Sequence, residues 1–153
     1  TRYISVTGVQ TCALPIWADL PSVFATLAAE PFSFGFLSNI TATDWPGAEP
    51  RFWVAYELLS LEHRHRLRVK VGVPEGDPVV PSVTERFPTA NWHERETYDF
   101  FGIIFDGHPG LTRIMMPDDW AGHPQRKDYP LGGIDIEYKG ATTPAPHLRR
   151  KYS

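Results

Sequence analysis

The sequence predicts an α+β domain, in which a small antiparallel sheet is packed by helices and followed by an extended Pro/Gly-rich C-terminal tail. Of the 153 residues, 42% are hydrophobic and 22% are charged, which is enough apolar material for one globular core. Apolar and basic side chains alternate along residues 64–73, as on a strand with one solvated face. Beyond residue 117, prolines and glycines interrupt every helical or alternating pattern. We therefore divide the chain into an arm (1–16), a domain (17–116) and a tail (117–153).

Residues 1–16 carry no periodic pattern, and we expect a non-native or disordered arm there. The stretch 6–16 resembles the translation of a sequencing adapter, so we expect the natural N-terminal portion to be missing. The arm holds Cys12, the single cysteine of the chain. One thiol can form neither an intrachain disulfide nor the ligand set of an iron–sulfur cluster.

The domain is expected to begin with a helix over residues 20–29, which Asp19 can cap. Three strands follow, and the last two form a hairpin because only residues 61–63 separate them. We expect these strands over residues 35–43, 51–60 and 64–73. Helices on one side of this antiparallel sheet are the simplest packing.

Two capping patterns after the sheet predict two further helices. A serine or asparagine three residues before a glutamate can accept from the first N–H groups of a helix, while the glutamate reaches back. The pairs are Ser82 with Glu85, whose helix stops at Pro88, and Asn91 with Glu94, whose helix runs over 92–101 and ends at Gly102. Short strands are expected over 103–105 and 111–116.

The helix 92–101 carries charged residues that could serve chemistry or structure. Arg95 and Asp99 are four residues apart and are predicted to pair along the helix. Glu94 and Glu96 point in different directions, which excludes a paired-carboxylate site. Four aromatic residues crowd the same helix and predict burial on all sides: Trp92, Tyr98, Phe100 and Phe101.

Six histidines raise the alternative of a metal site. His63 and His65 would share one face of a strand, and a loop histidine would supply a third ligand. A catalytic zinc needs three converging ligands and an open position, but the chain has no HExxH motif. A stand-alone metal-dependent hydrolase is therefore a distant alternative, and hydrogen-bonded histidines are the simpler interpretation.

Charge and patterning exclude other classes. The net charge is −3, whereas a nucleic-acid-binding chain usually has a strongly basic face. The longest apolar run, 100–105, is far shorter than the ~20 residues of a membrane helix. Glycine-rich phosphate loops of the GxGxxG or GxxxxGK[ST] kind are absent from the sequence. The tail keeps large aromatic residues that it cannot bury by itself, which predicts contact with the surface of a partner.

The unusual residue order of 92–109, WHERETYDFFGIIFDGHP, resembles the signature of the C subunit of proton-pumping NADH–quinone oxidoreductase (respiratory complex I), the 30 kDa-type subunit family. The resemblance continues through LTRI (111–114) and GHPQRKDYP (122–130), and PSVT (81–84) fits upstream. The end of the chain is similar to actinobacterial members. Gln125 departs from the pattern, because the family usually has an aliphatic residue there.

The resemblance implies a structural subunit of this translocase, with no catalytic, cofactor-binding or metal-binding residue in the chain itself. FMN, iron–sulfur clusters and quinone would be carried by other subunits, which pass electrons from NADH to quinone and drive proton translocation. The implied partners are the quinone-site subunit (D type) and the iron–sulfur subunits (B and I types), not a nucleic acid. The implied location is peripheral, on the cytoplasmic face of the bacterial cell membrane. The equivalent subunit of a related membrane-bound hydrogenase or another cofactor dehydrogenase is the alternative.

The resemblance places the partner surface on the helix 92–101 and the tail. Glu94 or Glu96 is expected to pair with an arginine of a partner. Trp120 and Tyr129 are expected to anchor the tail on the partner, and without the partner the tail is expected to lack order. The expected interface residues are Trp92, Glu94, Arg95, Glu96, Asp99, His108, Trp120, His123 and Tyr129, with Arg113, Arg126, Lys127 and Asp128 as the charges that set the register.

Overall fold

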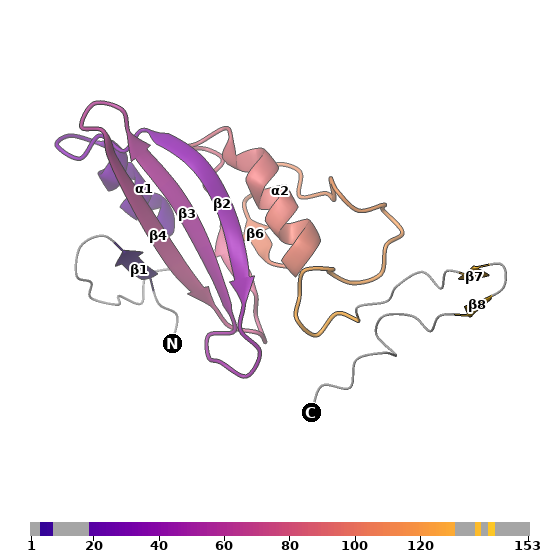
Figure 1. The fold of residues 1–153 in the computed structure, drawn as a ribbon. Helices are drawn as coiled ribbons and strands as arrows, with labels where there is room; N and C mark the ends of the chain where they lie inside the picture. Colours follow the sequence, from indigo (N-terminus) through magenta and orange to yellow (C-terminus); the bar gives the residue numbers. More distant parts are fainter. Residues whose placement is uncertain (1–3, 8–18, 131–136, 139–140, 143–153) are drawn as a thin grey trace.

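Three nine-residue strands form the centre of an antiparallel sheet in the computed structural model, which describes residues 4–7, 19–130, 137–138 and 141–142. The strands are β2 (Phe36–Asp44), β3 (Phe52–Ser60) and β4 (His65–Val73). A shorter strand, β1 (Ile4–Thr7), pairs with β4, and the order across the sheet is β1-β4-β3-β2 (Figure 1). The three predicted strands are thus confirmed to within one residue at each end.

The register of β3 and β4 explains why their side chains alternate. Val54 lies opposite Val71 and Tyr56 lies opposite Val69, and all four are buried on the same face of the sheet. Arg66 and Arg68 project from the other face into solvent, as the alternation predicts.

Both helices add buried side chains to the core on the apolar face of the sheet. These helices are α1 (Leu20–Ala28) and α2 (Ala90–Phe101), and in Figure 1 α1 lies behind the sheet while α2 runs beside β2. The Phe24 ring packs against Tyr56 with ring centroids 5.0 Å apart. The predicted α+β class is confirmed. Within the described residues, no helix has the length and apolar character that crossing a bilayer would require.

Two short strands complete the apolar face of the domain. β5 (Val79–Pro81) and β6 (Ile104–Asp106) pair in parallel. The sequence predicted a short strand near β6 but missed β5, which is only three residues long and carries no alternation. β1 lies within the arm, for which no strand was predicted, and the non-native origin of that arm stays a prediction. Cys12 lies outside the described residues.

The helix predicted after Ser82 is wrong, because that stretch forms turns instead. Ser82 Oγ donates to the carboxylate of Glu94, twelve residues away, so it does not cap a local helix as predicted. The N-terminus of α2 is Ala90 rather than Trp92, and its N-cap is Thr89 with no side-chain cap bond. Its predicted end is confirmed: Gly102 has a φ of 74°, a left-handed conformation that glycine adopts without cost.

The strand predicted over 111–116 is also wrong, since this segment is irregular. Three of its backbone N–H groups donate to a carboxylate of α2 instead of to a neighbouring strand. In the predicted tail, residues 117–130 have no helix or strand, and β7 (Glu137–Tyr138) pairs with β8 (Ala141–Thr142).

Candidate functional site

Asp99 is the centre of the contact between α2 and the irregular segment that follows β6. Its side chain is fully buried, and Oδ2 accepts N–H bonds from Ile114, Met115 and Met116 at 3.1, 2.8 and 2.9 Å. Oδ1 accepts from Arg113 at 3.0 Å. Burial alone would raise the pKa of Asp99, but these donors offset it and hold the pKa below its usual value.

The predicted Arg95–Asp99 pair along α2 is therefore wrong. Asp99 points inward to the segment 113–116, whereas Arg95 lies on the outer side of the helix. Arg95 donates to the carbonyl oxygen of Thr112 at 3.1 Å and to its hydroxyl at 2.9 Å. Its guanidinium also lies 5.1 Å from the ring centroid of Trp92. Arg113, predicted as a charge for a partner, neutralises Asp99 within the chain.

The first part of the predicted tail folds back onto the end of α2. His123 Nδ1 donates to the carbonyl oxygen of Asp99 at 2.9 Å. The backbone N–H of Gln125 donates to the carbonyl oxygen of Phe100 at 3.1 Å. A Cβ atom on Gly102 would come within 2.6 Å of the His123 ring, so glycine is needed there for contact as well as conformation. The Tyr129 hydroxyl donates to the carbonyl oxygen of Ala121, so this expected anchor stabilises its own loop.

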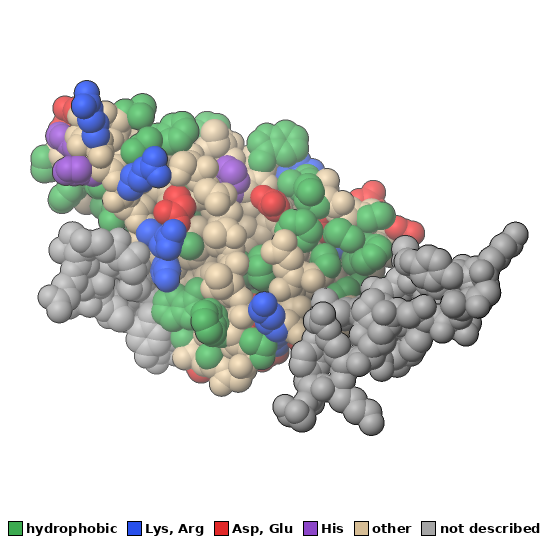
Figure 2. Space-filling view, viewed as in Figure 1, with side chains coloured by type: hydrophobic (Ala, Val, Ile, Leu, Met, Phe, Trp, Pro, Cys, Tyr) green, Lys and Arg blue, Asp and Glu red, His purple; other side chains and the backbone are tan. Residues whose placement is uncertain are grey.

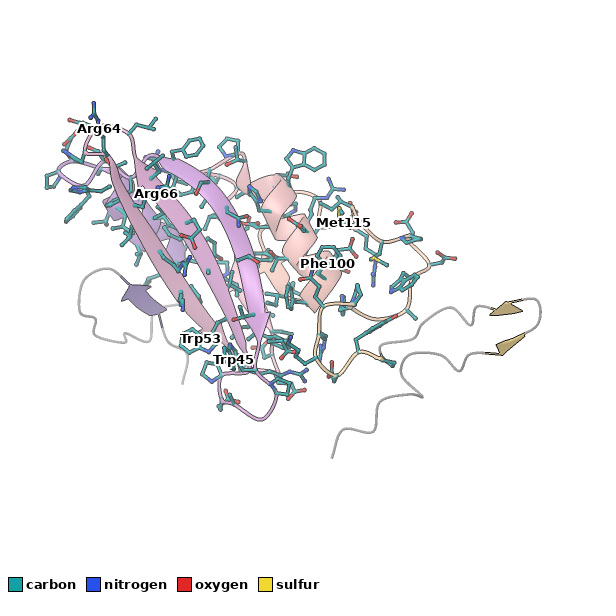
Figure 3. All side chains as sticks on the ribbon, viewed as in Figure 1. Trp45, Trp53, Arg64, Arg66, Phe100 and Met115 are labelled. Atoms are coloured by element: carbon teal, nitrogen blue, oxygen red, sulfur yellow. The ribbon has the colours of Figure 1, made fainter. Side chains whose placement is uncertain are left out.

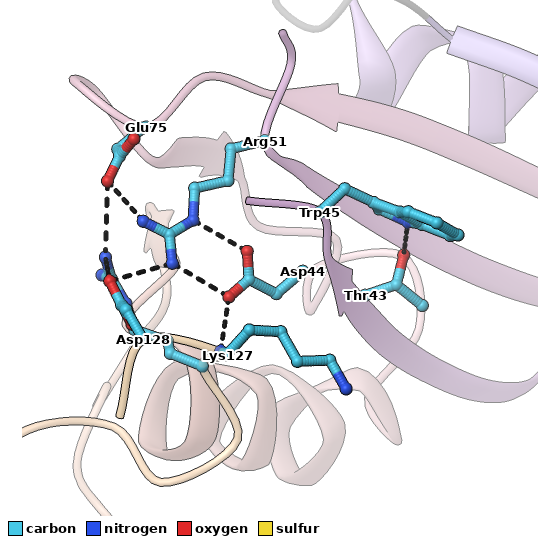
Figure 4. A network of polar contacts seen from close by, with 8 residues as sticks. Thr43, Asp44, Trp45, Arg51, Glu75, Lys127 and Asp128 are labelled. Atoms are coloured by element: carbon cyan, nitrogen blue, oxygen red, sulfur yellow. Dashed lines mark hydrogen bonds and ion pairs between the residues drawn. The ribbon is translucent and has the colours of Figure 1, made fainter. Parts of the chain in front are cut away.

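A cluster of ion pairs fastens the next tail residues to the end of the sheet (Figure 4). Arg51, almost fully buried, donates to Asp44 through Nε at 2.7 Å and through Nη2 at 3.0 Å. It also pairs with Asp128 at 2.9 Å and with Glu75. Asp44 further accepts the backbone N–H of Lys127 at 2.7 Å. We refer to Asp44, Arg51, Glu75, Arg126 and Asp128 as the Arg51 cluster.

The Arg51 cluster accounts for charges that were predicted to set the register of a partner. Arg126 pairs with Asp128 at 3.2 Å, and its guanidinium lies 5.2 Å from the centroid of the Phe52 ring. The hydrogen bond from Arg51 lowers the pKa of Asp44 against the opposing effect of burial. Sequence reasoning missed Asp44 and Arg51. One signal was present, because Asp44 follows Ala42 by two residues and so falls in the row of side chains that faces the core.

Glu94 is buried in the interior of the domain. Its carboxylate accepts from the backbone N–H of Val83 at 2.8 Å and from Ser82 Oγ at 2.7 Å. Burial raises the pKa of Glu94 to about 7, although these two hydrogen bonds act in the opposite direction. Glu94 is therefore unable to receive an arginine of a partner, and for the half-buried Glu96 that contact stays a prediction.

A pH-dependent stability is expected from Glu94. Its folded pKa lies above its unfolded value, so its contribution is fully present below about pH 4.5 and is lost as pH rises through about 7. Relative to Glu94→Gln, the wild-type free energy of unfolding should fall by about 3 kcal/mol between pH 4 and pH 8. Urea unfolding of both proteins across this range measures the difference. Glu96→Gln is the control, because it removes a carboxylate from the same helix. If the difference in free energy of unfolding between wild type and Glu94→Gln varies with pH no more than that between wild type and Glu96→Gln, the expectation is contradicted.

Large apolar side chains remain exposed beside these fixed polar contacts. Trp92 is 63% exposed, Met115 61% and Trp120 40%, so the predicted burial of the helix on all sides is wrong for Trp92. Figure 2 shows hydrophobic side chains over α2 and the segment that follows, and Figure 3 places Met115 beside this helix. Arg95 links the Trp92 ring to Thr112, three residues before Met115. We refer to Trp92, Arg95 and Met115 as the α2 surface, and Trp120 is exposed further along the segment that follows.

The histidines of the metal hypothesis do not converge. His63 and His65 have ring centroids 6.2 Å apart, and His63 bonds to the carbonyl oxygen of Pro31 at 3.0 Å. His108 donates to the carbonyl oxygen of Asn91 at the start of α2 and accepts from the N–H of Gly110. Among the described residues, the one group with metal-ligand spacing is Glu30, Glu62 and His63, all exposed.

Comparisons with known proteins give one consistent result. The family model of the respiratory-chain NADH dehydrogenase 30 kDa subunit matches residues 17–135. The chain is 55% identical over 125 residues to the C subunit of NADH-quinone oxidoreductase from a Nocardioides species, covering 81% of this chain and 50% of that relative. It is 54% identical over 138 residues to the protein of the same name from Mycobacterium avium, covering 89% of this chain and 59% of that relative.

A solved structure agrees with these sequence relatives. The chain is 35% identical to the structure titled "Nqo5 of the trypsin-resistant fragment (1-134) in P63 form", and the TM-score is 0.59. The match covers 71% of this chain and 89% of that one. The chain spans about half to three fifths of the length of the curated relatives named above.

Proposed function

The chain belongs to the 30 kDa subunit family of the respiratory-chain NADH dehydrogenase, and we propose that it is a structural subunit of an NADH–quinone oxidoreductase. In this proposal the chain binds other subunits through its surface, and the groups that react are held by those subunits. FMN, iron–sulfur clusters and quinone are held by those subunits, which transfer electrons from NADH to quinone and couple this transfer to proton translocation. The sequence supports this division, since its single cysteine cannot hold a cluster alone.

The proposed partners are the quinone-site subunit (D type) and the iron–sulfur subunits (B and I types). We place this chain peripherally at the cytoplasmic face of the cell membrane, with other subunits of the complex in contact with the bilayer. The tail beyond residue 130 is proposed to lie on the quinone-site subunit. Residues 122–129 would set where that tail leaves the domain, because their own contacts are made within the chain.

The α2 surface is the observation that carries this proposal. Trp92 is 63% exposed, and it projects from a helix whose inner side is anchored to the domain by Glu94 and Asp99. Tryptophan and arginine are enriched where interfaces derive most of their binding free energy. A Trp92–Arg95 cation–π pair at the surface is therefore well suited to a partner that covers it.

Trp92→Ala is expected to weaken assembly without unfolding the domain. A central tryptophan contributes about 2 kcal/mol to an interface, which corresponds to about a 30-fold loss of affinity. The measurement is the yield of NADH–quinone oxidoreductase subunits that co-purify with the tagged chain from an actinobacterial host whose own copy of this subunit has been deleted. Leu61→Ala, which removes another exposed apolar side chain at the β3–β4 turn, is the matched control.

The results of this experiment distinguish an error about the α2 surface from an error about the proposed function. Wild-type yield with Trp92→Ala would show that the α2 surface is not an interface. Failure of the wild-type chain to capture any other subunit of the enzyme would overturn the proposed function itself. Capture of hydrogenase subunits in place of NADH-oxidising ones would favour the alternative assembly.

A further inference from the structure

A row of basic side chains lies on the outer face of the sheet, away from both helices. Arg66, Arg68 and Lys70 alternate along β4 with the buried residues of the core, so all three project from this face. These side chains project from the plane of the sheet, in which β4 pairs with β3 along its whole length, so the row lies on a face of the sheet. Figure 2 shows Lys and Arg side chains along this side of the molecule.

Most of this positive charge is not neutralised by neighbouring carboxylates. Among the residues that the structure describes, Arg68 pairs with Glu57 of β3, and Arg66 and Lys70 form no ion pair. Three cations thus face a single carboxylate in a chain whose net charge is −3. An uncompensated cluster on an otherwise acidic chain produces a local positive potential that attracts anionic groups.

The surface around the row has a groove and an aromatic end. Ser38 and Asn39 of β2 line a groove of about 380 Å³ together with Glu57, Arg66 and Arg68. At the other end of the same face, half-buried Trp53 lies opposite Gly72, two residues beyond Lys70. Figure 3 shows Arg66 and Trp53 toward opposite ends of the sheet.

We propose that this outer face is a second interaction surface, which binds an extended acidic segment of a partner protein in the assembled complex. Alternate residues of a strand lie about 7 Å apart, so an extended segment with carboxylates at every second position matches the spacing of Arg66, Arg68 and Lys70. The groove supplies hydrogen-bonding groups for the backbone of that segment, and Trp53 supplies contact for one apolar side chain. This inference rests on the proposed function, because it needs the chain to be part of a complex.

Charge complementarity favours a polypeptide over a membrane surface. The cations form one line along a strand beside a groove with polar side chains, whereas adhesion to lipid headgroups needs only a diffuse basic patch. Binding to an anionic bilayer is the competing outcome of the test.

Carbodiimide coupling in the purified complex tests the proposal directly, because this reagent joins an amine to a carboxylate in contact with it. Lys70 is expected to couple to an aspartate or glutamate of another subunit, identified by mass spectrometry. Arg66→Glu should reduce the yield of this cross-link at least about threefold by repelling the same segment. Arg86→Glu makes the same charge change at an exposed residue that is not on the outer face, and should leave the yield unchanged.

Two outcomes would overturn the proposal. One is a complex in which other lysines of the chain are coupled while Lys70 joins no other subunit. The other is sedimentation of the purified chain with phosphatidylglycerol vesicles that is lost in Arg66→Glu, kept in Arg86→Glu and accompanied by no partner cross-link. If the chain captures no other subunit at all, the proposed function has failed instead.

Discussion

Asp99→Ala is expected to lower the free energy of unfolding by about 3–5 kcal/mol, because a fully buried acceptor of several hydrogen bonds is removed. Three backbone N–H groups and the Arg113 guanidinium lose their acceptor together. The segment 113–116 should then detach from α2, since these bonds take the place of a strand ladder. Urea unfolding monitored by tryptophan fluorescence measures the loss.

Two further variants separate charge from packing at Asp99. Asp99→Asn keeps the size and one oxygen acceptor, so its loss should be smaller than that of alanine but still exceed about 1 kcal/mol, as for a hydrogen bond to a charged group. Asp119→Ala removes an exposed carboxylate from the same region and should change stability by less than about 0.5 kcal/mol. Because the pKa of Asp99 is lowered, its contribution should disappear as pH falls below about 4. An Asp99→Ala protein as stable as Asp119→Ala would contradict this account.

Arg51→Met is expected to cost about 3 kcal/mol or more, because it leaves the buried Asp44 carboxylate without its cation. Asp128 and Glu75 are half exposed, so water replaces most of what they lose. Arg51→Lys keeps the charge but cannot donate to Asp44 through two nitrogens at once, which predicts an intermediate loss. The measurement is again the urea midpoint.

The pH dependence gives the second readout for Arg51→Met. In the wild type, the lowered pKa of Asp44 stabilises the fold above its unfolded pKa, and this contribution is lost as the carboxylate becomes protonated. The difference between wild type and Arg51→Met should therefore shrink as pH falls toward 3. Arg86→Met, at an exposed position, is the control. A pH-independent difference would mean that the cost comes from lost packing and not from an unpaired charge.

The strands of the sheet could be predicted because their signal is local. Residues 64–73 alternate strictly, and the hairpin that joins β3 to β4 fixes their register. The end of α2 was also readable, because Gly102 is placed where a left-handed residue is needed. Each of these inferences depends on a few neighbouring residues and on backbone geometry that any chain shares.

The polar contacts could not be predicted, because their partners are distant in sequence. The pattern of Ser82 and Glu85 suggests a capping box, yet Ser82 bonds to Glu94. Arg95 and Asp99 have helix-pair spacing, yet Asp99 has four better-placed donors on a later segment. A buried acceptor is satisfied by whichever donors the tertiary fold brings to it, and local spacing does not encode that choice.

The candidate site divides in the same way. The resemblance singled out the helix 92–101 and residues 122–130, and these segments do meet, through His123 and Gln125. It did not separate residues that face outward from those that hold the domain together. Glu94, Asp99 and Arg113 belong to the second group, whereas the roles of Trp92 and Trp120 in a partner interface stay predictions.

The backfolded residues 123–128 have a consequence for genetic experiments on the C-terminal region. Deleting everything after residue 117 would remove the Lys127 N–H that Asp44 accepts and the Asp128 carboxylate that pairs with Arg51. The same deletion would also remove the rest of the tail. A screen that scores only respiratory growth could not distinguish such a folding defect from the loss of a docking site, because both would reduce growth. Truncation after residue 130 keeps these contacts, so it is the deletion whose phenotype reports on the remaining tail alone.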